Sequence, residues 1–299
     1  MPPPASASVP DPSGGRRAGD PAAAAGPAAA DPADLALALR LADRADELTV
    51  AAFRSAGLVV DTKPDLTPVT DADRGVETAI RSLIAAERPG DAVVGEEYGT
   101  TGTGPRRWIL DPIDGTKNFV RGIPVWATLI ALEVDGAIVV GTVSAPALGR
   151  RWWAGRGLGA FAGPCPSSSL AGSMGQVAPI RVSKVAALGD AQITGPGLES
   201  WDEHPGGVAR LAALAAATWR DRGFGDFWSH MLVAEGACDV GLDPVASLWD
   251  LAALQVIVEE AGGRFSDMTG APRPDGGSAI STNGLVHDAA LAILGGHDR

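Results

Sequence analysis

The chain has 299 residues, enough for a large core and two lobes, and its 39 glycines are typical of an α/β protein with many tight connections. A formal net charge of -12 disfavours nucleic acid and anionic membranes as partners, although bound cations would still permit an anionic substrate. Cys165 and Cys238 form no disulfide framework or zinc motif, and no apolar run approaches the ~20 residues of a membrane span, so we expect reduced thiols in a cytoplasmic protein.

Residues 1–30 are rich in proline and alanine and lack the hydrophobic centre of a signal peptide. We interpret them as a dispensable, disordered leader or a misassigned start. Order is predicted to begin at Asp31 and Pro32, an N-cap followed by proline at the first helical position. The texture of the sequence then predicts an N-terminal α/β lobe, residues 31–145, and a C-terminal α/β lobe, residues 146–299.

The N-terminal lobe is predicted to begin with two helices. The first has an apolar stripe that stops at Gly57 and consists of Leu35, Leu39, Ala42, Ala45 and Leu48. The second starts at Thr70. Strands are predicted at residues 58–62, 92–94, 108–110, 126–134 and 137–143. Because Asp135-Gly136 between the last two is a strong hairpin signal, the sheet should contain antiparallel pairs and is not purely parallel.

The C-terminal lobe is predicted to combine a surface loop, helices and a strand. Residues 163–179 are rich in glycine, serine and proline and predict a surface loop. Helices are expected near residues 208–217, 229–236 and 247–261, and residues 238–242 resemble a strand. Gly262-Gly263 should end the last helix.

Four acidic residues fall at the ends of predicted elements, where side chains can converge in a cleft. They are Glu96, Asp111, Asp114 and Asp250. Each alone could be a solvated acid or a helix cap. Together they are difficult to explain as caps, because they follow short apolar strands or open a buried helix. Four crowded carboxylates require about four positive charges, which two Mg²⁺ ions supply.

Asp114-Gly115-Thr116 is typical of a helix start whose free N–H groups could hold an anion. A metal site beside an anion cradle indicates phosphate chemistry, and two metals are a known arrangement for phosphate hydrolysis. The four histidines lie far in sequence from the acidic blocks, which disfavours a histidine-based phosphatase.

The segment from about residue 34 to residue 295 resembles the inositol monophosphatase family of Mg²⁺-dependent, lithium-sensitive phosphatases. Three blocks carry the resemblance: Gly95-Glu96-Glu97, Asp111-Pro-Ile-Asp-Gly-Thr116 with Asn118-Phe119, and Trp249-Asp250-Leu-Ala-Ala253. The resemblance implies an α/β (α+β) fold, the layered α/β/α/β/α sandwich of the inositol monophosphatase and fructose bisphosphatase type. It also implies a homodimer, since many members are dimeric.

The resemblance implies metal ligands by motif position. Glu96, Asp111 and the carbonyl of Ile113 would hold one ion. Asp111 would also bridge to a second ion, which Asp114 and Asp250 complete. The cofactor would be two to three Mg²⁺ ions per site, with Mn²⁺ as an alternative and Li⁺ as an inhibitor.

The resemblance also implies catalytic roles for Thr116, Asp73 and Glu96. The N–H groups of Gly115 and Thr116 would bind phosphate, and Thr116 would help to position the attacking water. Asp73 would pair with Thr116 and contact a third, weaker ion. The position of Glu96 in the motif favours it over Glu97 as the metal ligand. Glu97 would then interact with the ligands and not with the metal itself.

The implied reaction is direct in-line hydrolysis of a phosphate monoester by a metal-activated water, without a phosphoenzyme. Haloacid-dehalogenase-like phosphatases are an alternative, since they use Asp-x-Asp-Gly-Thr with a nucleophilic aspartate. This chain has one more residue between Asp111 and Asp114, which reverses the relative direction of the two side chains on an extended segment. A catalytically silent metal-binding regulator is a non-enzyme alternative, but such proteins usually lose a ligand.

The segment Lys117-Asn-Phe-Val-Arg-Gly-Ile-Pro-Val-Trp-Ala-Thr128 resembles the actinobacterial histidinol-phosphate phosphatases of this family more than the inositol-specific members. It predicts hydrolysis of L-histidinol phosphate to L-histidinol and phosphate, a reaction of histidine biosynthesis. An inositol-1-phosphate phosphatase or a broad-specificity sugar-phosphate phosphatase remains the alternative.

Three residues are predicted to contact the substrate. Asp243 lies seven residues before Asp250, where inositol-acting members carry an acid that contacts ring hydroxyls, and it would suit an ammonium group equally well. Arg222 and Asp226 are further candidates. Trp126 fits a core position better than a substrate platform, and Arg121 could pair with a surface acid or approach the neighbouring site of a dimer.

Overall fold

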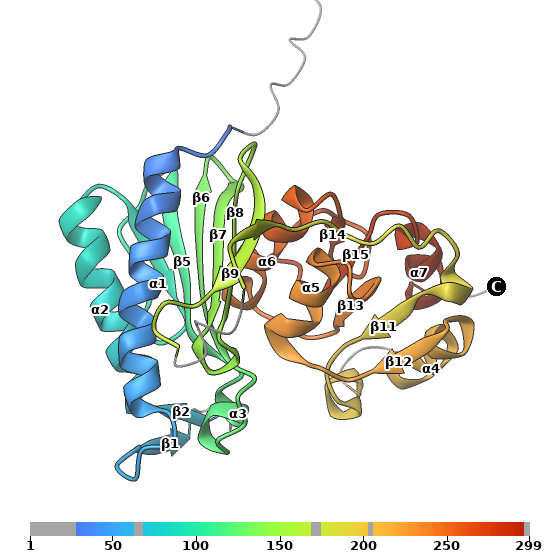
Figure 1. Ribbon diagram of the computed structural model, residues 1–299, viewed down its shortest axis with the longest axis horizontal. Helices are drawn as coiled ribbons and strands as arrows, with labels where there is room; N and C mark the ends of the chain where they lie inside the picture. Colours follow the sequence, from blue (N-terminus) through green and yellow to red (C-terminus); the bar gives the residue numbers. More distant parts are fainter. Residues whose placement is uncertain (1–27, 63–67, 169–174, 203–205, 296–299) are drawn as a thin grey trace, which may run out of the picture.

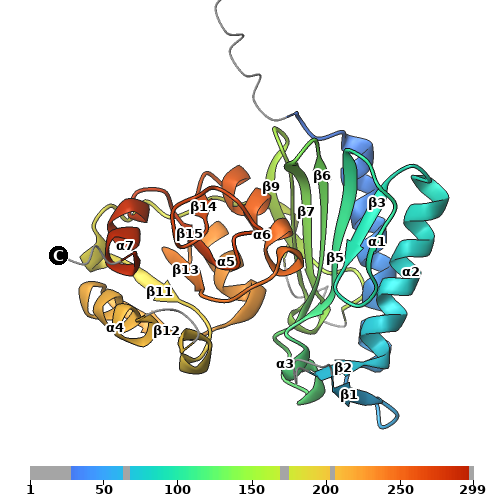
Figure 2. The same cartoon turned by 180° about the vertical axis from the view of Figure 1, so that it is seen from behind.

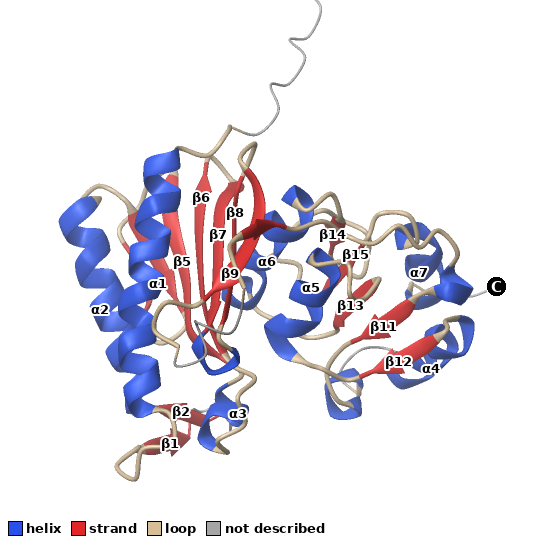
Figure 3. Ribbon diagram, viewed as in Figure 1, coloured by secondary structure: helices blue, strands red, loops and turns tan. Residues whose placement is uncertain are grey.

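The computed structural model describes residues 28–62, 68–168, 175–202 and 206–295 (Figure 1). These residues form five layers, in which helices and sheets alternate from one side of the molecule to the other (Figures 1 and 3). The predicted α/β/α/β/α sandwich is therefore confirmed. Within these ranges, no helix is both long and apolar enough to cross a membrane. The predicted leader lies outside the described residues as far as residue 27.

Helices α1 (Pro32–Ala52) and α2 (Asp71–Glu87) form the first layer. Asp31 caps α1 as predicted, accepting a hydrogen bond of 2.8 Å from the Ala33 N–H. The predicted apolar stripe is only partly right. Ala42 and Ala45 are buried as predicted, whereas Leu35, Leu39 and Leu48 are only half-buried. The other buried side chains of the helix are Leu37, Ala38, Leu41, Asp34, Asp46 and Thr49. The buried face includes polar residues that pair with the sheet, so apolar periodicity alone misplaced it.

The second layer is an eight-stranded sheet with the order β10-β9-β8-β7-β6-β5-β3-β4. Its strands are β3 (Ala92–Gly95), β4 (Gly99–Thr101), β5 (Arg106–Asp114), β6 (Ala127–Val134), β7 (Ala137–Ala145), β8 (Arg150–Gly155), β9 (Gly159–Pro164) and β10 (Ala178–Pro179). Among the described strands of this sheet, β3 and β5 are the only neighbours that pair in parallel, and all other neighbours are antiparallel. Asp135 and Gly136 have φ angles of 51° and 81° in the β6–β7 turn, so the predicted hairpin is confirmed.

The fourth layer is a five-stranded sheet with the order β12-β11-β13-β15-β14. Its strands are β11 (Gln192–Thr194), β12 (Arg220–Arg222), β13 (Val240–Asp243), β14 (Arg264–Ser266) and β15 (Ala279–Thr282). Helices α4 (Gly207–Ala217) and α7 (His287–Leu294) cover its outer face. The remaining elements are β1 (Val60–Thr62), β2 (Pro68–Thr70), α3 (Thr116–Val120) and short 3₁₀ turns at Pro146–Leu148, Leu188–Asp190 and Leu198–Trp201.

Helices α5 (Asp226–Ala234) and α6 (Leu248–Glu260) fill the layer between the sheets (Figure 2). Helix α6 buries an uninterrupted run from Leu251 to Val258 because both of its faces are covered. It lies so close to β7 that a Cβ on Gly141 would come within 2.5 Å of the Ala253 carbonyl oxygen. This close approach fixes the helix whose first turn carries Asp250.

The chain passes from the first sheet to the second after β10, near residue 180. Strands β8 and β9 belong to the first sheet because they continue its antiparallel meander from β7. The passage is therefore later than residue 145, where the change of sequence texture placed the division between lobes. The division into two lobes stays a prediction.

Candidate active site

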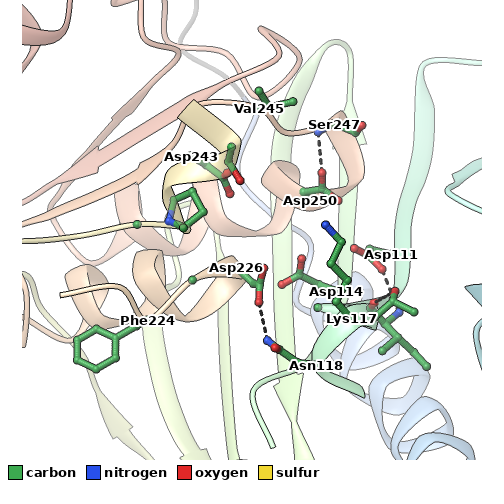
Figure 4. Close-up of a pocket in the computed structure, with 18 of the residues that line it drawn as sticks. Asp111, Asp114, Lys117, Asn118, Phe224, Asp226, Asp243, Val245, Ser247 and Asp250 are labelled. Atoms are coloured by element: carbon green, nitrogen blue, oxygen red, sulfur yellow. Dashed lines mark hydrogen bonds between the residues drawn. The ribbon is translucent and has the colours of Figure 1, made fainter. Parts of the chain in front are cut away.

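A cavity of about 610 Å³ lies where the ends of β5, β11 and β13 meet the first turns of α3, α5 and α6. Its lining is dominated by acids. Seven acidic residues contribute to it: Glu96, Asp111, Asp114, Glu199, Asp226, Asp243 and Asp250. Among the described residues that line it, Lys117 is the only cationic one, and Figure 4 shows its side chain directed toward Asp111, Asp114 and Asp250. The structure therefore brings together the four acids that the sequence singled out.

Asp111, Asp114 and Asp250 form the centre of the cavity. Their carboxylate oxygens lie within 4.8 Å of one another. The pairing of β5 with β6 shifts register between Asp111 and Asp114, and such an irregularity changes the direction of the side chains beyond it. Asp250 occupies the third position of α6, where its Oδ2 accepts a 2.6 Å hydrogen bond from the Ser247 N–H as part of a capping box.

The electrostatics of these carboxylates favour a bound cation. Burial raises the pKa of Asp111 well above its ordinary value, and Glu96, Asp114 and Asp250 raise it further. Burial likewise raises the pKa of Asp114, with Asp226 and Asp250 adding to the effect. A hard divalent cation relieves such repulsion, and Mg²⁺ prefers oxygen ligands of this kind. The all-oxygen donor set of this cavity therefore fits magnesium.

The backbone at position 115 requires glycine. Its φ of 80° is left-handed, and an added Cβ would come within 2.9 Å of the Val125 carbonyl oxygen and 3.3 Å of Asp226 Oδ2. Helix α3 begins directly after it, at Thr116. The first N–H groups of a helix have no partner within the helix, so they are suited to an anion in this cavity.

Thr116 connects the cavity to a buried aspartate behind it. Its hydroxyl donates to the Ile113 carbonyl oxygen at 2.9 Å and, more weakly, toward Asp73 Oδ1 at 3.4 Å. Asp73 is fully buried, and its other carboxylate oxygen accepts from the backbone N–H and the hydroxyl of Thr70. Burial raises the pKa of Asp73 to about 6, against the effect of the Thr70 hydrogen bonds and with a contribution from Glu97 and Glu96.

Glu96 and Glu97 follow β3 but take different places. Glu96 lines the cavity, whereas Glu97 does not and lies close enough to Asp73 to raise its pKa. Their turn is held from behind by Glu77, which accepts hydrogen bonds from the N–H groups of Glu97 at 2.8 Å and Tyr98 at 3.2 Å. Glu77 was not predicted to be a functional residue. Its position beside Val76, on the buried face of α2, is the sequence signal that could have identified it.

Replacement of Glu77 should destabilise the protein strongly. Glu77 is fully buried and also pairs with Arg81 at 2.7 Å, so Glu77→Ala removes the charge partner of the Arg81 guanidinium and leaves two turn N–H groups unsatisfied. We expect the free energy of unfolding to fall by about 3 kcal/mol or more. Glu87→Ala, at another position of α2, breaks an exposed pair with Arg40 of α1 and should cost less than about 1 kcal/mol. Urea denaturation measures both values, and equal losses would contradict the role of Glu77.

Asp226 and Asp243 form the wall of the cavity opposite β5. Asp226 has a left-handed φ of 49°, and Asn118 holds it by a 2.9 Å hydrogen bond from Nδ2 to Oδ2 (Figure 4). The next N–H, that of Phe227, donates to Asp114 Oδ2 at 2.8 Å. Burial raises the pKa of Asp243 well above its ordinary value, and Asp250 and Asp226 raise it further. No local sequence pattern predicts that Asn118 and Phe227 link the two walls.

Other substrate candidates lie outside the cavity. Arg222 is exposed on β12, donates to the Asp221 carbonyl oxygen at 2.7 Å and is not part of the lining. Arg121 is also exposed and does not line the cavity. Trp126 is fully buried and packs edge-on against Phe119 with the ring centres 4.9 Å apart, as expected of a core residue.

A buried carboxylate cluster that fits Mg²⁺, next to a helix start suited to phosphate, defines a metal-dependent phosphatase site. Comparison with known proteins agrees. The sequence profile of the inositol monophosphatase family matches residues 33–295. The chain is 56% identical over 265 residues to a histidinol-phosphatase of Mycobacterium tuberculosis, covering 87% of this chain and 97% of the relative. It is 49% identical over 265 residues to a histidinol-phosphatase of Streptomyces coelicolor, covering 87% and 96%.

Solved structures show the same fold. An inositol monophosphatase from Zymomonas mobilis superposes with a TM-score of 0.74 at 31% identity, covering 88% of this chain and 98% of that chain. The chain therefore belongs to the inositol monophosphatase family, and it is a phosphoric monoester hydrolase. The predicted family is confirmed, and the family depends on Mg²⁺.

Proposed function

We propose that this protein hydrolyses L-histidinol phosphate to L-histidinol and phosphate, a reaction of histidine biosynthesis. One observation carries the proposal beyond the family: the cavity holds more acid than the phosphate chemistry needs. Seven acidic side chains face one lysine. The similarity to the two histidinol-phosphatases supports the same substrate.

The charge of the cavity selects the leaving alcohol. Even with two Mg²⁺ ions bound, the lining and a phosphate dianion together keep a surplus of negative charge. Histidinol carries an ammonium group and an imidazole, which can be cationic near neutral pH, so it offsets the surplus. Inositol is neutral and cannot. Asp226 and Asp243, on the wall opposite β5, are placed to meet the cationic groups, because a carboxylate and an ammonium form a charge-assisted hydrogen bond.

The carboxylates divide into metal ligands and substrate contacts. Glu96, Asp111, Asp114, Asp250 and the carbonyl oxygen of Ile113 would hold two Mg²⁺ ions, and Asp73 would contact a third. When bound, Mg²⁺ polarises a phosphoryl oxygen and lowers the pKa of a water molecule. Asp111 is the most buried acid of this cluster and would be one of the ligands.

The remaining groups orient the reactants. The N–H groups of Gly115 and Thr116, at the start of α3, would bind the phosphate oxygens. The Thr116 hydroxyl oxygen can accept a hydrogen bond from the attacking water while its own proton is shared between the Ile113 carbonyl oxygen, 2.9 Å away, and Asp73 Oδ1, 3.4 Å away. Thr116 and Asp73 would therefore help to position the attacking water. We assign Arg222 no contact, because it does not line the cavity.

A substrate panel tests the proposal. With Mg²⁺, the purified protein should release phosphate from L-histidinol phosphate at least about a hundredfold faster, in kcat/KM, than from inositol-1-phosphate or fructose-1,6-bisphosphate, the equivalent of ~2.7 kcal/mol. Li⁺ should inhibit, and Mn²⁺ should replace Mg²⁺ in part. Equal rates across the panel would reject L-histidinol phosphate as the specific substrate but would still agree with a phosphatase. No turnover of any ester would reject both the substrate and the phosphatase activity. The homodimer and the cytoplasmic location stay predictions, which size-exclusion chromatography and cell fractionation can test.

A further inference from the structure

Glu199 lines the cavity but is neither a proposed metal ligand nor a proposed phosphate-binding residue. It lies in the 3₁₀ turn Leu198–Trp201, which follows β11. Strand β11 pairs in parallel with β13, the strand that ends at Asp243. Because neighbouring parallel strands end at the same edge, their following segments emerge side by side. Glu199 is therefore presented from the same wall as Asp243.

The backbone before Glu199 leaves room for its carboxylate at this wall. A Cβ on Gly197 would come within 2.4 Å of Glu199 Oε2, so the side chain turns back over Gly197, another residue of the lining. Gly195 packs against β13, since a Cβ there would lie 3.1 Å from the Leu242 carbonyl oxygen. Gly195 thus seats the segment after β11 against β13, and Gly197 leaves room for the Glu199 carboxylate to turn back toward the cavity.

The three acids on this wall lie at different depths in the cavity, as their exposure shows. Asp226 and Asp243 are half-buried near the metal cluster, whereas Glu199 is exposed at the mouth. A ligand held by its phosphate at α3 would extend its far end toward the mouth. A carboxylate there suits a cationic group and has no partner in a neutral alcohol.

We propose that Glu199 is a specificity-determining residue that contacts the cationic group of the leaving alcohol farthest from the phosphate; the proposal rests on the function proposed above. Glu199 stabilises the bound cationic ester and contributes nothing to bond cleavage. Its effect appears in KM and not in kcat, and only with substrates that carry positive charge. One exposed charge-assisted contact corresponds to a roughly tenfold change in affinity.

Steady-state kinetics of Glu199→Gln test this assignment, because glutamine keeps the shape and removes the charge. We expect KM for L-histidinol phosphate to rise about tenfold with kcat within about twofold. The constants for p-nitrophenyl phosphate, a neutral-alcohol ester, should not change. Asp202→Asn is the matched control, since Asp202 is an exposed acid just beyond the same turn and does not line the cavity.

Binding of L-histidinol to the wild type and Glu199→Gln, measured by isothermal titration calorimetry, gives a second readout that needs no turnover. About tenfold weaker binding to the variant supports the contact even if the proposed reaction fails. Unchanged KM and unchanged binding overturn it. An equal loss with both esters also overturns it, because that result indicates a structural role. A wild type that cleaves p-nitrophenyl phosphate but neither cleaves L-histidinol phosphate nor binds L-histidinol rejects both the substrate and Glu199.

Discussion

Asp111→Asn should reduce phosphatase turnover at least about a thousandfold, the equivalent of ~4 kcal/mol of transition-state stabilisation. Asp111 lies in the carboxylate cluster whose oxygens are within 4.8 Å of one another, so the loss of its charge leaves the ions under-neutralised. The fold should survive. Asparagine has the same shape, and its side-chain oxygen can still accept the 2.9 Å hydrogen bond from the Ile113 N–H.

The same variant has an expected signature in stability. Burial and the neighbouring acids raise the pKa of Asp111 in the folded state, so at every pH above its unfolded pKa this residue destabilises the metal-free protein relative to an uncharged amide. The metal-free variant should therefore melt at a higher temperature than the metal-free wild type. Mg²⁺ should raise the melting temperature of the wild type but have much less effect on the variant.

Thermal unfolding in EDTA and in Mg²⁺, together with phosphate release, measures these effects. Asp190→Asn, at an exposed acid outside the cavity, should behave as wild type in every assay. Near-normal turnover of Asp111→Asn would reject the two-metal site. Lost turnover with an unchanged Mg²⁺ effect on melting would show that Asp111 acts without holding the metal.

The sequence predicted the acidic centre well because its signal is local. Asp111, Asp114 and Gly115 lie in one short segment, where a strand ends and a helix starts, and the physical consequences of crowded acids follow from spacing alone. Glu96 and Asp250 were found because each stands at the boundary of an apolar element. The order of Glu96 before Glu97 agrees with the cavity lining, although the role of each stays a prediction.

The supporting groups could not be predicted because they depend on contacts between distant segments. Asn118 reaches Asp226 across 108 positions of the chain, and the Phe227 N–H reaches Asp114 across 113. The left-handed φ of Asp226 has no local signature either, because glycine is the residue expected there. Buried acids such as Asp46 misled the helix pattern for a related reason: Arg151, on β8, pairs with Asp46 at 2.6 Å and makes a polar position part of the core.

Gly115→Ala should reduce turnover about a hundredfold, because a displacement of the phosphate-binding N–H groups by about 1 Å can cost that much. The added Cβ cannot be accommodated by a side-chain rotation, since its nearest contact, at 2.9 Å, is the backbone carbonyl of Val125. The start of α3 must therefore shift, and the N–H groups of the first turn move with it. Stability should also fall by roughly 1 kcal/mol or more from the left-handed φ of 80°.

Gly136→Ala separates these two effects. Gly136 has a similar φ of 81°, but nothing lies within 4 Å of the added Cβ, and the residue sits in the β6–β7 turn away from the cavity lining. It should lose a similar amount of stability in urea denaturation and keep the turnover of the wild type. If the two variants lose activity equally, left-handed strain alone explains the effect, and the proposal that the N–H groups at Gly115 and Thr116 bind phosphate is rejected. If only Gly115→Ala loses activity, and does so mainly in kcat/KM, the position of the α3 N–H groups is what the reaction requires.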